Sequence, residues 1–210
     1  MTYSNVVNIA LEDIRVGCNA SVGGLSLGAN KMLLFGANNN VGIADISRCT
    51  VLALLSGHTN VITSVKWIPK EKLLETEFIS CSADATMRYW IQNERNTSGW
   101  DCLQVLYGHS STVLGCSLVA LSDGKNLLAS LSSDSTVRIW RSDIIDRQWE
   151  TIQIFNFSPQ IICSVSLFAY SNSENGILLA LGSVDFHINI YHSAYIKSQR
   201  LGQRFKFCIY

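Results

Sequence analysis

A nine-residue phrase occurs twice in this 210-residue sequence, and its repetition limits the fold more than any other feature. The phrase reads SADATMRYW at residues 82–90 and SSDSTVRIW at residues 132–140, so the copies lie 50 residues apart. Each copy places an aspartate six positions before a tryptophan, with a threonine two positions after the aspartate. Similarity within a chain at such a period indicates repeat units that bury their apolar surfaces by stacking on one another.

A Gly-His pair precedes each copy of the phrase at nearly the same distance. His58 lies 26 positions before Asp84, and His109 lies 25 positions before Asp134. The repeat unit therefore reads Gly-His, a strand, a loop, a second strand, a turn that carries the aspartate, and a third strand that ends in tryptophan. We expect the chain to contain two well-formed units of this kind.

Apolar residues alternate with a period of two within each unit, which is typical of β-strands. The alternation is clear in VITSVKW at 61–67 and in ATMRYW at 85–90, and CLQVLYG at 102–108 supplies a fourth strand. Both faces of the resulting four-stranded sheet are apolar, so one sheet cannot bury them alone. Stacking of successive sheets around an axis solves this problem, and the sequence therefore predicts a β-propeller.

The spacing of Gly-His, aspartate and tryptophan resembles that of the WD40 repeat family. Kelch repeats have a similar period but carry a diglycine in every blade, and the only diglycine in this chain is Gly23-Gly24. The resemblance implies an all-β fold of about four WD40 blades. A closed ring takes up to about eight blades, so we expect an incomplete ring and interpret the chain as an N-terminal portion, an isoform or a truncated gene product.

The repeats divide the sequence into five segments. These are a degenerate first blade at 1–50, two WD40 blades at 51–100 and 101–150, a degenerate blade at 151–195, and a basic tail at 196–210. In the fourth blade Asp185 again precedes an aromatic residue, Tyr191, by six positions, but Leu181 replaces the expected serine. In the first blade Asn39 and Asp45 occupy the aspartate and tryptophan positions. We interpret the tail as a solvated, non-native end, with a nucleic-acid-binding tail as the alternative.

The recurring polar residues have two interpretations. Histidine, aspartate and serine could form a hydrolase triad, but a catalytic constellation is needed at one place only, whereas this set recurs in each unit. Resemblance to the WD40 family implies instead a structural hydrogen-bond network formed by His58, Ser80, Asp84, Trp90, His109, Ser130, Asp134, Trp140 and Asp185. Buried polar groups that pair with one another avoid the cost of desolvation. We expect no catalytic or cofactor-binding residue. We also expect no metal site, since His187 and His192 have no third ligand near them in the sequence.

Composition excludes several classes of function. Charged residues make up 15% of the chain, with 16 acidic and 16 basic side chains, so no overall field attracts nucleic acid or a membrane surface. No apolar stretch approaches the roughly 18 residues of a membrane span. The seven cysteines are odd in number and scattered, which favours reduced thiols. We therefore expect a cytoplasmic protein with a nuclear pool.

The order of a degenerate blade, two strong repeats and the segment at 153–191 resembles the WD40 subfamily found in the Elongator complex. That resemblance implies a non-catalytic scaffold that organises the large scaffold subunit and the acetyltransferase subunit of a complex that modifies wobble uridines of transfer RNA. Contact with transfer RNA would be indirect at most. The alternative is another WD40 adaptor, such as a peptide-recognition or ubiquitin-ligase substrate module, which the same blades could build.

Overall fold

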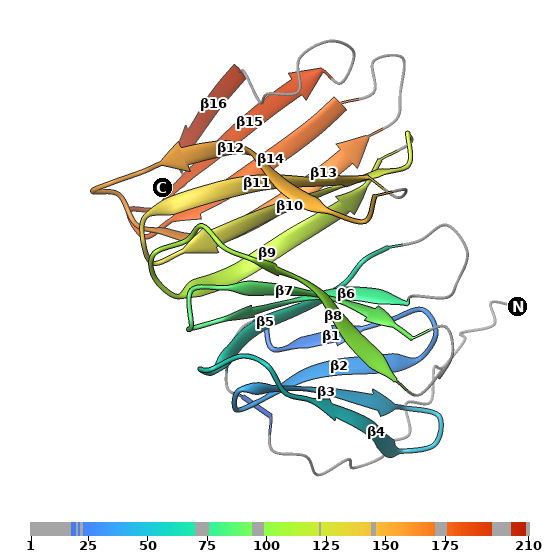
Figure 1. The fold of residues 1–210 in the computed structure, drawn as a ribbon. Coiled ribbons are helices and arrows are strands. Elements are labelled where there is room, and N and C mark those ends of the chain that lie inside the picture. Colours follow the sequence, from blue (N-terminus) through green and yellow to red (C-terminus); the bar gives the residue numbers. More distant parts are fainter. Residues whose placement is uncertain are drawn as a thin grey trace, which may run out of the picture.

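The structure is a computed structural model, and it describes residues 18–19, 21, 23–69, 76–93, 99–121, 123–143, 146–170, 176–194 and 203–208. The described residues form sixteen β-strands and no helix. The strands make four antiparallel sheets of four strands each, which stack in chain order from the blue sheet to the red sheet (Figure 1). The expected all-β fold of about four WD40-type blades is therefore confirmed.

Each blade is formed by four consecutive strands. Blade 1 contains β1 (Leu25–Leu27), β2 (Met32–Ala37), β3 (Asn40–Asp45) and β4 (Thr50–Leu55). Blade 2 contains β5 (Ile62–Trp67), β6 (Glu77–Ser82), β7 (Met87–Gln92) and β8 (Trp100–Leu106). Blade 3 contains β9 (Val113–Ala120), β10 (Lys125–Ser132), β11 (Thr136–Asp143) and β12 (Trp149–Asn156). Blade 4 contains β13 (Ile162–Tyr170), β14 (Gly176–Ser183), β15 (His187–Ala194) and β16 (Gln203–Cys208).

Burial follows the position of a strand within its blade. Every residue of β6 is buried, because this inner strand is covered on both faces by the neighbouring sheets. The outer strand β4 has no buried residue and exposes four of its six side chains. The apolar character of both faces, noted in the sequence, thus reflects sheets that are sandwiched between other sheets.

An apolar core fills each space between neighbouring blades. Between blades 1 and 2, Leu34 and Val41 pack with Trp67 and Phe78. Between blades 2 and 3 the core contains Tyr89, Leu128, Trp140 and Trp149, and between blades 3 and 4 it contains Leu127, Ile139, Leu179 and Tyr191. The face-to-face stacking that the sequence predicted is therefore the source of the burial.

Hydrogen bonds also join the first strands β5, β9 and β13 to one another and join β5 to Gly23, which lies just before β1. These bonds are Val65 N to Gly23 O at 2.9 Å, Thr63 Oγ1 to Val113 O at 2.5 Å, and Leu167 N to Ser117 Oγ at 2.9 Å. The blades therefore contact one another through their first strands as well as through the apolar cores. This arrangement orients the turns of successive blades in the same direction.

The blades and the sequence repeats divide the chain at different points. All of strand β4 except Thr50 lies in the second repeat segment, yet β4 completes blade 1, because this last strand of the sheet precedes the Gly-His pair of the next repeat. Strand β16 lies within the segment interpreted as a basic tail and pairs with β15. Residues 1–17 of the first segment, and Lys197 and Arg200 of the tail, lie outside the described residues. Within the described part of the chain, no helix has the length and apolar character of a membrane span.

Candidate functional site

A chain of hydrogen bonds links the recurring polar residues of blade 2. His58 precedes β5, and its Nδ1 and Nε2 atoms lie 2.8 Å from Asp84 Oδ2 and 2.9 Å from Ser80 Oγ. The indole Nε1–H of Trp90 donates to the same Ser80 Oγ at 2.9 Å. The histidine, serine and tryptophan side chains are buried. The chain therefore ties the entry to β5, strand β6 and strand β7 to one another.

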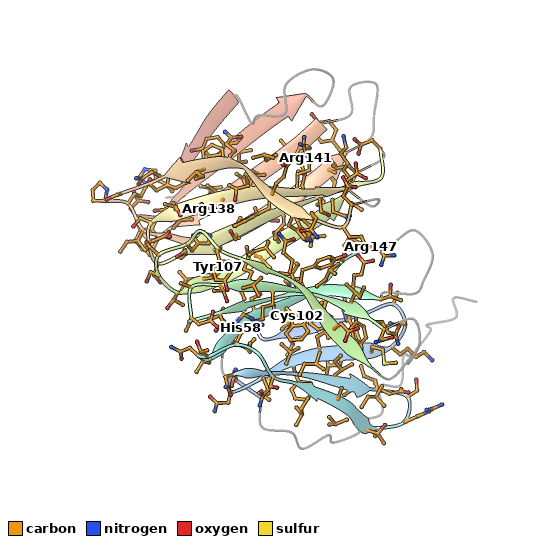
Figure 2. All side chains as sticks on the ribbon, viewed as in Figure 1. His58, Cys102, Tyr107, Arg138, Arg141 and Arg147 are labelled. Carbon is orange, nitrogen blue, oxygen red and sulfur yellow. The ribbon has the colours of Figure 1, made fainter. Side chains whose placement is uncertain are left out.

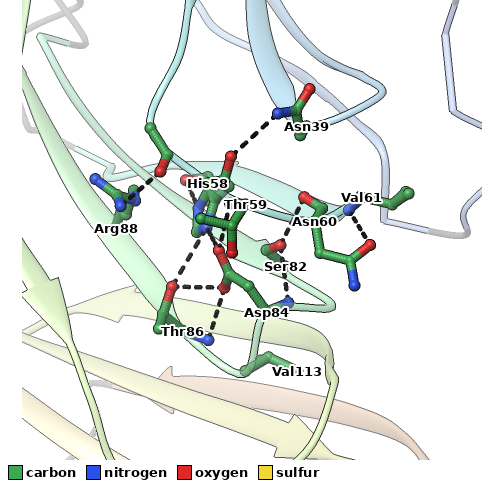
Figure 3. Close-up of polar contacts among 12 residues, drawn as sticks. Asn39, His58, Thr59, Asn60, Val61, Ser82, Asp84, Thr86, Arg88 and Val113 are labelled. Atoms are coloured by element: carbon green, nitrogen blue, oxygen red, sulfur yellow. Dashed lines mark hydrogen bonds and ion pairs between the residues drawn. The ribbon is translucent and has the colours of Figure 1, made fainter.

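The turn between β6 and β7 is organised by the carboxylate of Asp84 (Figure 3). Its Oδ2 accepts the backbone N–H of Thr59 at 3.0 Å, and its Oδ1 accepts both the N–H and the hydroxyl of Thr86 at 2.9 and 2.6 Å. Ala85, which lies between Asp84 and Thr86 in the chain, adopts a left-handed backbone conformation with φ of 66°. The short side chain of an aspartate can accept hydrogen bonds from several nearby backbone N–H groups, which stabilises such a turn.

Blade 3 repeats this arrangement atom for atom. His109 Nδ1 lies 3.0 Å from Asp134 Oδ2, and its Nε2 lies 2.7 Å from Ser130 Oγ. The Trp140 indole donates to Ser130 Oγ at 2.8 Å. His58, of blade 2, and Arg138, of blade 3, both lie toward the left-hand ends of the blades in Figure 2. In both sheets the network joins the residues before the first strand to the second and third strands, so the two networks occupy equivalent places.

Electrostatics fixes the protonation states within the networks. Burial lowers the pKa of His58 and of His109, and the neighbouring carboxylates offset this effect in part. Burial alone would raise the pKa of Asp84, but hydrogen bonds from Thr86, Thr59 and His58 lower it to about 2. A neutral histidine with its proton on Nδ1 can donate to the aspartate and accept the serine hydroxyl on Nε2. Each ring nitrogen of the histidine then has a hydrogen-bond partner.

The network leaves no reactive atom open to a substrate. Ser80 and Ser130 have no solvent exposure, and each hydroxyl oxygen is in contact with an imidazole and an indole. A serine nucleophile needs access to a carbonyl carbon and a nearby oxyanion site. Within the described ranges, no group of three or more metal-ligating side chains occurs. The geometry is thus suited to holding strands together.

Asp185 of blade 4 has different partners from those of Asp84 and Asp134. Gln160 Nε2 donates to Asp185 Oδ2 at 2.6 Å, and His187 Nδ1 lies 3.0 Å from Oδ1. The Asp185 side chain is 44% exposed, compared with 8% for Asp84 and 8% for Asp134. Tyr191 fills the tryptophan position by packing on Phe155, with ring centroids 4.9 Å apart. The structure therefore does not join Asp185 to a histidine–serine–tryptophan chain.

Blade 1 uses amides where the strong blades use the histidine and the aspartate. Asn39, at the aspartate position, donates through Nδ2 to His58 O at 3.2 Å, as Figure 3 shows. Asp45 accepts the backbone N–H of Ser47 at 2.8 Å and does not replace the indole. Asn19 donates to Asn38 O at 2.8 Å and to Ile62 O at 3.0 Å, which links blade 1 to blade 2. No repeat spacing in the sequence identifies Asn19.

Two arginines lie against the glycine of each Gly-His pair, and the sequence interpretation missed them. Arg88 Nη2 donates to Gly57 O at 2.7 Å (Figure 3). A Cβ on Gly57 would lie 2.8 Å from Arg88 Nη1, and a Cβ on Gly108 would lie 2.8 Å from Arg138 Nη1. Both arginines stand four positions after the turn aspartate, so their recurrence in the repeated phrase was a usable signal.

Comparison with known proteins agrees with this geometry. The family model for the WD domain, G-beta repeat, matches residues 49–90 and 100–141. These matches begin near β4 and at β8 and run through the strands that carry the two networks. The chain belongs to the WD40 repeat family.

Several similar proteins are Elongator subunits. Elongator complex protein 2 from Dictyostelium discoideum is 32% identical over 203 residues, which cover 88% of this chain and 22% of that protein. Elongator complex protein 2 from Danio rerio is 30% identical over 86% of this chain and 22% of its own length. Pre-mRNA-processing factor 19 from Mus musculus is 34% identical over 77% of this chain and 28% of its length. The chain thus spans between a fifth and a third of the length of these relatives. The resemblance to the WD40 subfamily of the Elongator complex, which the sequence indicated, is confirmed.

Proposed function

We propose that the chain is a non-catalytic scaffold of the Elongator complex that binds other proteins through the ends of its blades. The observation that carries this proposal is the identity to Elongator complex protein 2 over 88% of the chain, which includes the degenerate blades as well as the two WD40 matches. Elongator complex protein 2 of Danio rerio, Arabidopsis thaliana, Mus musculus and Saccharomyces cerevisiae also matches over at least 80% of the chain.

The polar networks in this proposal serve only as internal fasteners. The residues that would form them are His58, Ser80, Asp84, Trp90, His109, Ser130, Asp134 and Trp140, with Asp185 closing a variant turn in blade 4. Burial of the serine hydroxyls and their contacts with indole groups support this role. A rigid stack of sheets then presents its turns and edges to other subunits.

The partners and the setting are proposed by analogy with the Elongator relatives. We propose that the chain contacts the large scaffold subunit and the acetyltransferase subunit, and that it supports wobble-uridine modification of transfer RNA without binding the RNA itself. The balance of 16 acidic and 16 basic residues supports indirect rather than direct contact with RNA. A cytoplasmic location with a nuclear pool suits this role.

Affinity purification of the tagged chain from cells of its source tests the proposal. We expect the large scaffold and acetyltransferase subunits to be enriched at least about tenfold over a tag-only control. Depletion of the protein should also lower wobble-uridine modification of transfer RNA. Recovery of a different set of proteins, with no Elongator subunit among them, would contradict the assignment.

The second candidate is another WD40 adaptor. It is favoured by the 34% identity to pre-mRNA-processing factor 19 over 163 residues. That match covers 77% of the chain, against 88% for the Dictyostelium Elongator protein. Pre-mRNA-processing proteins among the co-purified species, in place of the acetyltransferase subunit, would support this candidate.

A further inference from the structure

Blade 4 exposes three large apolar side chains at one end. Ile161 precedes β13 and is 58% exposed, while Val184 and Phe186 lie in the turn between β14 and β15 and are 53% and 80% exposed. Val184 N donates to Ile161 O at 3.1 Å, so the two segments that carry these side chains are in direct contact. We call Ile161, Val184 and Phe186 the apolar tip.

Blades 2 and 3 have smaller or polar residues at the equivalent positions. The equivalence follows from the strand register, which pairs Ile62 with Ser82, Val113 with Ser132 and Ile162 with Ser183. The apolar tip therefore corresponds to Val61, Ala83 and Ala85 in blade 2 and to Thr112, Ser133 and Ser135 in blade 3. The same turn forms without large apolar side chains.

Internal packing gives no reason for a large residue at the end of the tip. Phe186 has a left-handed backbone with φ of 62°, as have Ala85 at 66° and Ser135 at 64°. This conformation is unfavourable for a bulky side chain. At 80% exposure the Phe186 ring gains little from burial within the chain. Contiguous exposed apolar side chains of this kind mark a site of protein interaction.

A negative charge at the centre of the apolar tip indicates which side chains a partner would present. Asp185 lies between Val184 and Phe186 in the chain, and its side chain is 44% exposed. The corresponding carboxylates of blades 2 and 3 are covered by their histidines and are 8% exposed. Gln160 Nε2 and His187 Nδ1 contact the two oxygens of Asp185, and neither of these neighbours is a lysine or an arginine. The partly exposed carboxylate therefore attracts a cation that sits next to an apolar group.

We propose that the apolar tip and Asp185 bind a partner polypeptide that presents an apolar side chain next to a lysine or an arginine. The apolar side chain would pack on Phe186 and its neighbours, and the cation would face the carboxylate. This surface is distinct from the buried networks and does not depend on which complex contains the chain.

A library of random twelve-residue peptides displayed on phage, selected against the full chain, provides the probe. Selected peptides are expected to share an aromatic or aliphatic residue beside lysine or arginine. Replacement of the tip by the blade 3 residues, Ile161→Thr with Val184→Ser and Phe186→Ser, should weaken binding of a selected peptide at least about tenfold. Asp185→Asn should weaken it about three- to tenfold.

Tyr107→Ser is the matched control, because Tyr107 is 72% exposed and lies at the same end of the blades in Figure 2 but outside the tip. This variant should bind the peptide as the unaltered chain does. Hydrogen exchange of each variant verifies that the sheets are intact. Peptides without a basic residue, or equal binding by the tip variant, would overturn the proposal. Self-association of the chain that the tip variant abolishes would also overturn it, since a second copy would then be the occupant.

Discussion

Removal of the carboxylate of Asp134 should destabilise blade 3 far more than the same change at Asp185 destabilises blade 4. Asp134 accepts hydrogen bonds from His109 Nδ1, Ser110 N, and both the N–H and the hydroxyl of Thr136, at distances between 2.6 and 3.0 Å. The His109 side chain is 1% exposed, and without the carboxylate its Nδ1 keeps only the Thr136 hydroxyl oxygen as a neighbour, at 3.1 Å.

The magnitude follows from these contacts. A buried donor that loses its partner costs about 1–3 kcal/mol. Each of the other lost hydrogen bonds costs about 1 kcal/mol, minus the part that bonding to water recovers. We therefore expect Asp134→Ala to lower the free energy of unfolding by about 2–4 kcal/mol. Asp185→Ala removes a carboxylate that is 44% exposed, and we expect a loss below about 1 kcal/mol.

Urea denaturation followed by far-ultraviolet circular dichroism measures both changes on the same chain. Hydrogen exchange at the amides of β10 and β11 shows whether the loss is local to blade 3 in Asp134→Ala. If the Asp134 variant unfolded at the same urea concentration as the unaltered chain, or if Asp185→Ala had the larger effect, the interpretation of the network as a fastener would be wrong.

Three further predictions follow from the same geometry. Stability toward urea should fall as the pH is lowered from about 7 to about 2. Protonation of His58 and His109, whose pKa is lowered by burial, disfavours the folded state first, and the contribution of Asp84, whose pKa is about 2, is lost below about pH 4. A flat dependence in urea titrations would contradict this. Gly108→Ala should cost about 1–2 kcal/mol by thermal unfolding because φ at Gly108 is +152°. Gly115→Ala, with no atom within 4 Å of the added Cβ, serves as its control. Phe186→Gly should raise stability by up to about 1 kcal/mol in the same assay, since it relieves a left-handed phenylalanine; a loss would show that the ring packs within the fold.

The spacing of the repeats predicted the blades, and resemblance to the WD40 family implied the partners within the two strong networks. His109, Asp134 and Trp140 recur at fixed spacing from their blade 2 counterparts, and a recurring set of buried polar groups must satisfy itself locally. The recurrence of Arg88 and Arg138 was equally visible, but their contact with the Gly-His glycines depends on how the strand folds back toward the preceding loop.

The degenerate blades could not be predicted to the same depth. Gln160 lies 25 positions before Asp185, which is the spacing of His109 and Asp134, so its place was visible in the sequence although its residue type differs from the repeat. Asn19 links blades 1 and 2 and belongs to no repeated pattern. Strand β16 was overlooked because the positive charge of its segment was given more weight than the alternation of QRFKFC at 203–208. Contacts between segments distant in the chain depend on three-dimensional packing, which local patterns do not encode.

A double-mutant cycle between His109 and Asp134 tests the central claim most directly. The cycle compares the unfolding free energies of His109→Ala, Asp134→Ala and the double variant with that of the unaltered chain. If the two side chains act as one fastener, their effects are not additive, and we expect a coupling energy of about 1–3 kcal/mol. Additive effects, with a coupling energy near zero, would contradict the account.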